Sequence, residues 1–219
     1  APEAPVLHDD MFTDGVDPKP ETASNVFKRV EFPLGDADAG FAEAEVVVER
    51  EFNTKTVHQG YIEPQAVVAN ASEDGQCQIW CTTQGQFMVR GFVAQVVGLD
   101  ISQIRVTPSE IGGGFGGKTV TFFEPVAVAL SRKAGSPVKL VMSREEVFRG
   151  TGPTAGSASK VRIGAMKDGR IVAGEAILKL QAGAFPGSPV GPAAMCAFAP
   201  YDIPNVRAIA YDVVVNRPK

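Results

Sequence analysis

The sequence predicts a mixed α/β (α+β) fold in which strand–helix–strand units are combined with long β-hairpins. Apolar runs of strand length alternate with helix-like segments along the 219 residues. Asp-Gly pairs at 74–75 and 168–169 each separate two runs rich in strand-forming residues, which is typical of a hairpin turn. Hydrophobic residues make up 44% and charged residues 21%, so the chain can bury a core.

The composition of the chain changes near residue 35. Residues 1–35 hold several prolines and acidic residues and predict an extended, proline-rich arm or linker, with one short edge strand in VFKRVEF (26–32). Residues 36–219 carry the alternating pattern and are expected to form the domain proper. It begins with one or two helical turns in GDADAGFAEA (35–44) and a strand in AEVVVEREF (44–52).

A helix is predicted within residues 82–98, after the hairpin at 65–83. Thr82 or Thr83 can cap its start, and Gly98 can end it. Its apolar face is expected to consist of Phe87, Phe92, Val93, Val96 and Val97.

The remaining elements follow in order. We expect a short strand in ISQIRVTPSEI (101–111), a helix over 122–134 ended by Gly135, a buried strand in PVKLVM (137–142), a capping box in SREE (143–146), the hairpin around 168–169, a loop in PGSPVGPAA (186–194) and a last strand in VRAIAYDVVVN (206–216).

Composition and charge exclude several classes of function. The net charge is −4 and no basic patch is visible, so no nucleic-acid partner is expected. Apolar runs such as Val126–Leu130 are far too short for a membrane span. Cys77 and Cys81 would lie on one face of a strand, roughly 13 Å apart at ~3.3 Å per residue, too far for a disulfide or one zinc ion. We expect core thiols in a reducing compartment, the cytoplasm.

The segment IGGGFGGKT (111–119) admits three interpretations. Gly112–Thr119 match the phosphate loop of nucleotide hydrolases, in which Lys118 and Thr119 would serve phosphate and magnesium, but Pro108 breaks the strand that should lead into it. A tight structural turn is the second interpretation. The third is a backbone nest for a bulky anionic cofactor, in which Phe115 pins the loop by packing.

Several motifs in register resemble the molybdenum-cofactor-binding subunit of the xanthine oxidase and aldehyde oxidase family of molybdenum hydroxylases. The resemblance covers nearly the whole chain. Its motifs, in chain order, are GDADAGFAEAEVVVEREF, HQGYIEPQAVVA, IWCTTQ, IRVTPSE with IGGGFGGK, EPVAVALSRKAGSPVKLVMSREE, MKDGRIVAGEA and YDIPNVRAIAYDVVVN.

The resemblance implies roles for particular residues. Gln84 occupies the position whose glutamine contacts the molybdenum centre, and a neutral amide can donate to an oxygen ligand without adding charge. Phe115, with Gly114 and Gly116 beside it, occupies the position whose backbone lies against the metal's oxygen ligand. Because the family's metal is held by pterin sulfurs, Gln84 and Phe115 are expected near molybdenum without being its ligands. His58 and Glu63, in HQGYIEP, are expected to be structural rather than catalytic.

Two departures from the family pattern restrict the range of possible substrates. The purine-oxidising branch has a substrate-binding glutamate directly after the loop lysine, where this chain has Thr119. That branch also has a substrate arginine upstream of YDIPN, and the segment at 191–205 has none. These departures argue against xanthine. The resemblance implies that the small-molecule substrate is an aldehyde or an aromatic N-heterocycle, hydroxylated with water-derived oxygen.

The resemblance also implies that further segments, a cofactor and partner subunits are needed for activity. The family's arginine-containing cofactor loop and its late catalytic glutamate are not matched here, so residues 36–219 are expected to be the N-terminal part of the cofactor domain, with no catalytic residue and no activity alone. The expected cofactor is molybdenum–molybdopterin, with cytosine dinucleotide as the usual bacterial form. Iron–sulfur (2Fe-2S) and FAD centres are expected on partner subunits or domains. A nucleotide-binding domain and a non-catalytic structural module derived from the enzyme remain the alternatives.

Overall fold

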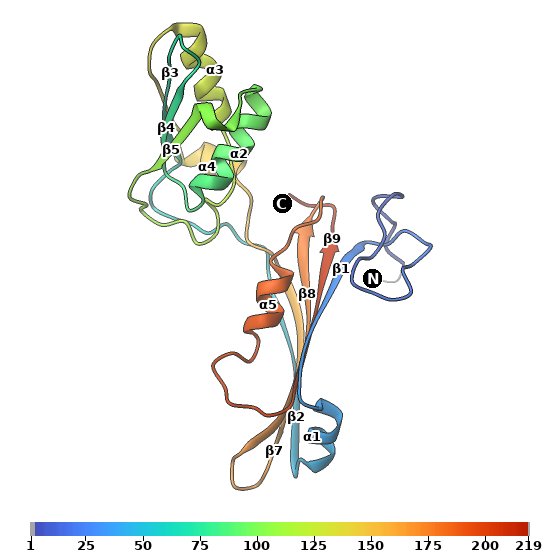
Figure 1. Cartoon of the computed structure of the whole chain (residues 1–219). Helices are drawn as coiled ribbons and strands as arrows, with labels where there is room; N and C mark the ends of the chain where they lie inside the picture. Colours follow the sequence, from blue (N-terminus) through green and yellow to red (C-terminus); the bar gives the residue numbers. More distant parts are fainter. Residues whose placement is uncertain (1–2, 219) are drawn as a thin grey trace. The chain divides into compact units, whose positions relative to one another are not determined.

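The computed structural model describes residues 3–218, which form two compact units (Figure 1). One unit combines Ala1–Val57 with Ala155–Lys219, and the other is His58–Thr154. Each unit contains one β-sheet with helices against it, which confirms the predicted mixed α/β class.

The unit formed by the two ends of the chain is built on a five-stranded mixed sheet. Its strand order is β1-β9-β8-β7-β2, with β8 and β9 parallel and the other pairs antiparallel. The strands are β1 (Val26–Leu34), β2 (Val46–Thr54), β7 (Ser157–Ala165), β8 (Ile171–Gly183) and β9 (Val206–Val214). The β7–β8 hairpin turns at Asp168 and Gly169, where Gly169 has a φ of 93°, as predicted from the Asp-Gly pair.

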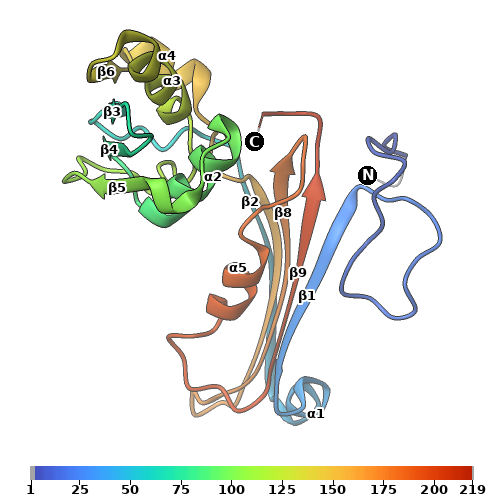
Figure 2. The same cartoon turned by 45° about the horizontal axis from the view of Figure 1, so that its top comes forward.

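Two helices contact this sheet. Helix α1 (Ala37–Glu43) follows β1 and confirms the helical turns predicted there. Helix α5 (Val190–Cys196) lies along the sheet (Figure 2), where Val190 and Ala194 pack with Ala208 and Ala210 of β9. The prediction of a loop over 186–194 was wrong for its second half, because a proline in the first turn of a helix lacks only an N–H that has no helical acceptor.

The unit of His58–Thr154 is built on a four-stranded sheet with the order β5-β4-β3-β6. Its strands are β3 (Ala66–Ala71), β4 (Cys77–Cys81), β5 (Ile104–Pro108) and β6 (Val138–Val141). Its helices are α2 (Gln86–Val97), the 3-10 turn η1 (Ile101–Gln103), α3 (Glu124–Ala134) and α4 (Arg144–Gly150). Strands β3 and β4 form the predicted antiparallel hairpin, whereas α2 connects β4 to the parallel strand β5.

The core of this unit lies between the sheet and helices α2 and α3. Cys77, Ile79 and Cys81 of β4 pack with Val93 of α2 and Val128 of α3, and all five are at most 2% exposed. The two thiols are therefore core residues, as predicted. Burial raises the pKa of Cys81 to about 12, which keeps this thiol protonated.

Local signals at helix ends were mostly confirmed. Gly98 and Gly135 end α2 and α3 in the left-handed conformation, with φ values of 68° and 61°. Ser143 and Glu146 form the reciprocal capping box that opens α4.

The predicted start of α2 was wrong, and its predicted apolar face was confirmed only for Val93 and Val97, which pack in the core. Its N-cap is Gly85, and the Thr82 hydroxyl accepts instead from the N–H of Ala66 while the Thr83 hydroxyl donates to the carbonyl of Lys118. The buried face of α2 contains Val89 and Val93, whereas Phe87, Phe92 and Val96 are exposed. Strand β6 is likewise an edge strand with alternating exposure and not a buried strand.

The boundary predicted at residue 35 remains a prediction, and residues 1, 2 and 219 lie outside the described part of the chain. Within the proposed arm, residues 26–34 form β1 and pair with β9. Among the described residues, no helix combines the length and apolar character needed to cross a lipid bilayer.

Candidate functional site

The candidate site lies on the glycine loop, residues 112–118, which follows β5 in the unit His58–Thr154. Gly113 and Gly116 have φ values of 95° and 85°, which side chains on L-residues rarely allow. Phe115 between them has a φ of 51° and is the one non-glycine residue with positive φ within residues 3–218. A strained residue at the bend of an open loop is a feature that often marks a functional position.

Gln84 is bonded directly to this loop. Its side-chain Oε1 accepts hydrogen bonds from the backbone N–H groups of Gly116, at 3.1 Å, and Lys118, at 3.2 Å. Its own backbone N–H donates to the carbonyl of Lys118 at 2.9 Å. A Cβ atom on Gly114 would lie 2.4 Å from Gln84 Oε1, so only glycine permits this approach. The structure therefore brings together Gln84, Gly114, Phe115 and Gly116, the four residues that the resemblance placed beside the cofactor.

The arrangement leaves hydrogen-bond donors available. Because Oε1 of Gln84 is occupied by loop amides, the carboxamide retains its Nε2 group, which donates no hydrogen bond to any described residue. The backbone N–H groups of Gly113, Gly114 and Phe115 likewise have no acceptor within residues 3–218. Gln84 and Phe115 are both exposed. Neighbouring uncharged donors of this kind can bind the oxygen atoms of an anionic ligand.

Phe115 does not pin the loop by packing, contrary to expectation. Its side chain is 72% exposed, so little apolar burial offsets the cost of its left-handed backbone. The loop is held by Glu63 and Gln84 through hydrogen bonds instead.

Lys118 is the second internal anchor of the loop. Its side chain has no exposed surface, and its Nζ lies 2.7 Å from Oε2 of Glu63 and 4.9 Å from the centre of the Tyr61 ring. The same Glu63 oxygen accepts the N–H of Gly112 at 2.8 Å. The sequence predicted a structural role for Glu63 but not its partner; the signal available was a lone lysine within a run of glycines.

This geometry argues against a phosphate loop. The buried Lys118 ammonium is already paired with Glu63 and does not point to a free phosphate site. The hydroxyl of Thr119 donates to the carbonyl of Gly116 at 3.0 Å. Helix α3 begins only at Glu124, so the loop does not run into a helix N-terminus as phosphate loops do.

His58 has the structural role expected from its motif. Its Nδ1 accepts the N–H of Gly60 at 3.0 Å, so the neutral ring carries its proton on Nε2 and donates it to the Thr151 hydroxyl at 2.8 Å. Burial and then the positive charge of Arg144 lower the pKa of His58 below its ordinary value. The ring is therefore neutral near pH 7.

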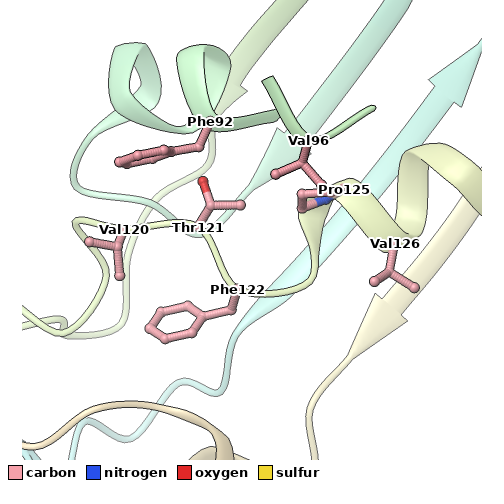
Figure 3. Close-up of a pocket in the computed structure, with 7 residues that line it drawn as sticks. All are labelled: Phe92, Val96, Val120, Thr121, Phe122, Pro125 and Val126. Carbon is pink, nitrogen blue, oxygen red and sulfur yellow. The ribbon is translucent and has the colours of Figure 1, made fainter. Parts of the chain in front are cut away.

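A shallow apolar groove continues from the loop beyond Thr119 (Figure 3). Its volume is about 340 Å³, within the range of small-molecule sites. Side chains converge on it from α2, from the segment after the loop and from the start of α3: Phe92, Val96, Val120, Thr121, Phe122, Pro125 and Val126. The Thr121 hydroxyl is buried here without a hydrogen-bond partner among the described residues. Nowhere in residues 3–218 do three His, Cys, Asp or Glu side chains gather as metal ligands.

Comparison with known proteins assigns the chain that carries this site to a family. A profile described as the molybdopterin cofactor-binding domain matches residues 18–219. The chain belongs to this family. This result confirms the resemblance to the molybdenum-cofactor subunit of the xanthine oxidase family that the motifs indicated.

Individual relatives of this molybdopterin cofactor-binding domain support the same family assignment. The nicotinate dehydrogenase large molybdopterin subunit of Eubacterium barkeri is 32% identical over 200 residues, which cover 89% of this chain and 47% of that subunit. The solved aldehyde oxidoreductase of Desulfovibrio gigas superposes with a TM-score of 0.73 at 26% identity, over 94% of this chain and 23% of that one. CO dehydrogenase of Oligotropha carboxidovorans gives 0.73 at 31% identity, over 90% and 26%. The chain thus spans about half or less of these proteins.

Proposed function

We propose that the glycine loop and Gln84 hold an oxygen-bearing face of a molybdenum–molybdopterin cofactor, in a hydroxylase that oxidises an aldehyde or an aromatic N-heterocycle. One observation carries the proposal: the Gln84 carboxamide is oriented by two loop amides through its oxygen, so its Nε2 group and the N–H groups of residues 113–115 remain for a ligand. The family match supports the identity of that ligand.

The residues present suit such a group. The loop offers dipoles and no net charge, because the Lys118 ammonium is neutralised by Glu63. The glycines let the cofactor approach the backbone, and Phe115 adopts the left-handed conformation at the bend of the loop. When bound, the cofactor would supply the two-electron oxidation of substrate with water-derived oxygen, and the protein supplies binding and orientation.

The substrate class is proposed from two observations. The relatives include a nicotinate dehydrogenase and an aldehyde oxidoreductase. Their names give an aromatic N-heterocycle and an aldehyde as substrates of proteins similar to this one. Thr119, at the position that faces substrate in the family, is neutral, and the apolar groove follows directly after it. A substrate with a largely apolar ring fits these side chains better than a purine that needs a carboxylate partner.

The finer assignments are proposals as well. We propose a cytosine dinucleotide form of the cofactor, 2Fe-2S and FAD centres on partner subunits or domains, the remainder of the molybdopterin subunit as a partner and a cytoplasmic location. No catalytic residue is assigned to this chain. By itself it is expected to turn over no substrate, and dye reduction by the isolated 219 residues would contradict this.

Removal of the Gln84 carboxamide tests the cofactor site. In the assembled subunit, Gln84→Ala should lower the bound molybdenum and pterin content several-fold, because it removes a ligand donor and the acceptor of two loop amides. Gln86→Ala, two residues later at the start of α2, serves as the matched control and should retain full content. Equal molybdenum and pterin contents in Gln84→Ala and wild type, measured by elemental analysis and pterin fluorescence, would refute the proposal.

A further inference from the structure

We infer that Glu63 is a positioning residue: it acts through Lys118 and Gly112 to hold the glycine loop in the conformation that presents Gln84 to the cofactor. The identity of the ligand to which the loop presents Gln84 rests on the proposed function above. The clamp itself is a property of this chain and can be tested without any cofactor.

Glu63 contacts the loop at both of its ends. At the entry, its Oε2 accepts the Gly112 N–H at 2.8 Å, and its own backbone N–H donates to the Gly112 carbonyl at 3.2 Å. At the exit, the same Oε2 accepts from the Lys118 ammonium at 2.7 Å. The fit at Gly112 is tight, since a Cβ there would lie 2.6 Å from the Cβ of Glu63. One carboxylate therefore closes the loop at both ends.

Lys118 transmits this restraint to Gln84. Its side chain ends at Glu63, whereas its backbone N–H donates to Gln84 Oε1 and its carbonyl accepts the N–H of Gln84. Displacement of the Lys118 side chain would therefore move the backbone that orients the Gln84 carboxamide. Glu63 and Gln84 do not share a hydrogen bond with each other, so any effect of Glu63 on Gln84 passes through the loop.

Burial makes the clamp stiff. The Lys118 side chain is fully buried, and an ammonium in that position must keep its counter-ion because an unpaired buried charge is strongly unfavourable. Its Nζ also lies over the ring of Tyr61, whose hydroxyl is bonded to Gln65 and to Thr151 at 3.3 Å. Tyr61 is 1% exposed, as is Gln65, so the clamp is fastened to the core of the unit.

Hydrogen exchange of the cofactor-free chain tests the clamp. In Glu63→Gln and in Lys118→Met, the hydrogen-bonded amides of Gly116, Gly117 and Lys118 should exchange about tenfold or more faster than in wild type, because local opening becomes easier. The exposed pair Glu145 and Arg149, 2.9 Å apart on α4, provides matched controls. Glu145→Gln and Arg149→Met should leave exchange of the loop unchanged. Amides of β3 and β4, in the core of the same unit, report whether a variant has unfolded that unit as a whole.

The double variant separates positioning from mere destabilisation. Glu63→Gln with Lys118→Met removes both charges and leaves neither unpaired, so its loop should exchange more slowly than the product of the two single effects predicts. A strictly multiplicative result, or wild-type exchange in Glu63→Gln, would overturn the clamp.

Retention of cofactor then tests its consequence. In the assembled, molybdenum-loaded subunit, Glu63→Gln should release pterin about tenfold faster than wild type, while Glu145→Gln should not. Faster loop exchange with an unchanged release rate would overturn the positioning role. If wild type binds no pterin, the proposed function fails, and the exchange data alone decide whether the clamp exists.

Discussion

The Oε1 atom of Gln84 lies 3.1 Å from the backbone nitrogen of Gly116, so a side chain between β4 and α2 is bonded to the bend of the glycine loop. This bond leaves the other end of the carboxamide as a donor. It also makes the site sensitive to changes in the loop that add even one carbon atom, or that change its backbone preference.

A methyl group at Gly114 should displace Gln84. Its Cβ would lie 2.4 Å from Gln84 Oε1, so Gly114→Ala is expected to lower the free energy of unfolding by about 1–3 kcal/mol. Gly91, inside α2, has no atom within 4 Å of its added Cβ apart from its chain neighbours and the nearby backbone of its own helix. The control Gly91→Ala should raise the free energy by about 0.5–1 kcal/mol. Urea unfolding measures both, and a Gly114→Ala variant as stable as wild type would contradict the close approach.

A residue that tolerates the left-handed region should make the protein more stable at position 115 than phenylalanine does. Its φ is 51° and its ring is 72% exposed, so Phe115→Asn is expected to raise the free energy of unfolding by about 0.5–1 kcal/mol. Phe115→Val, β-branched, should lower it. If the two variants change stability in the same direction, the backbone strain assigned to this position is wrong.

His58 should make stability depend on pH in a defined direction. Its pKa is lowered in the folded state, and protonation of Nδ1 would break the bond from Gly60. The unfolded chain therefore binds more protons, and the His58 contribution is complete above about pH 6.5 and declines as pH falls toward the lowered pKa. Subtraction of the His58→Gln profile from wild type removes the contributions of other groups. A difference that stays flat from pH 7 to 5 would contradict the lowered pKa.

The cysteines should differ in reactivity. Cys77 and Cys81 are buried, and the pKa of Cys81 is about 12, whereas Cys196 is exposed. A thiol reagent at pH 8 should modify Cys196 rapidly in the native chain, and the other two only after denaturation. Rapid labelling of Cys81, located by peptide mapping, would show that the sheet opens far more readily than its packing indicates.

The sequence by itself determined the features that depend on neighbouring residues. Asp-Gly pairs place both hairpin turns, Gly98 and Gly135 end their helices, and Ser143 with Glu146 opens α4. In each case the stabilising bonds join residues at most a few positions apart, so a short stretch of sequence contains the whole interaction. The motifs also indicated the family and predicted that Gln84 and the glycine loop lie near the same metal centre, although not that they are bonded to each other.

Only the tertiary structure decided which surfaces are buried and which charges meet. The apolar pattern of α2 did not reveal that Val89 faces the core while Phe87 faces solvent, because the helix carries apolar residues on both sides. The pairing of Glu63 with Lys118 joins residues 55 positions apart. No local preference encodes such a contact, since it exists only after the sheet and its helices have packed and excluded water from the lysine.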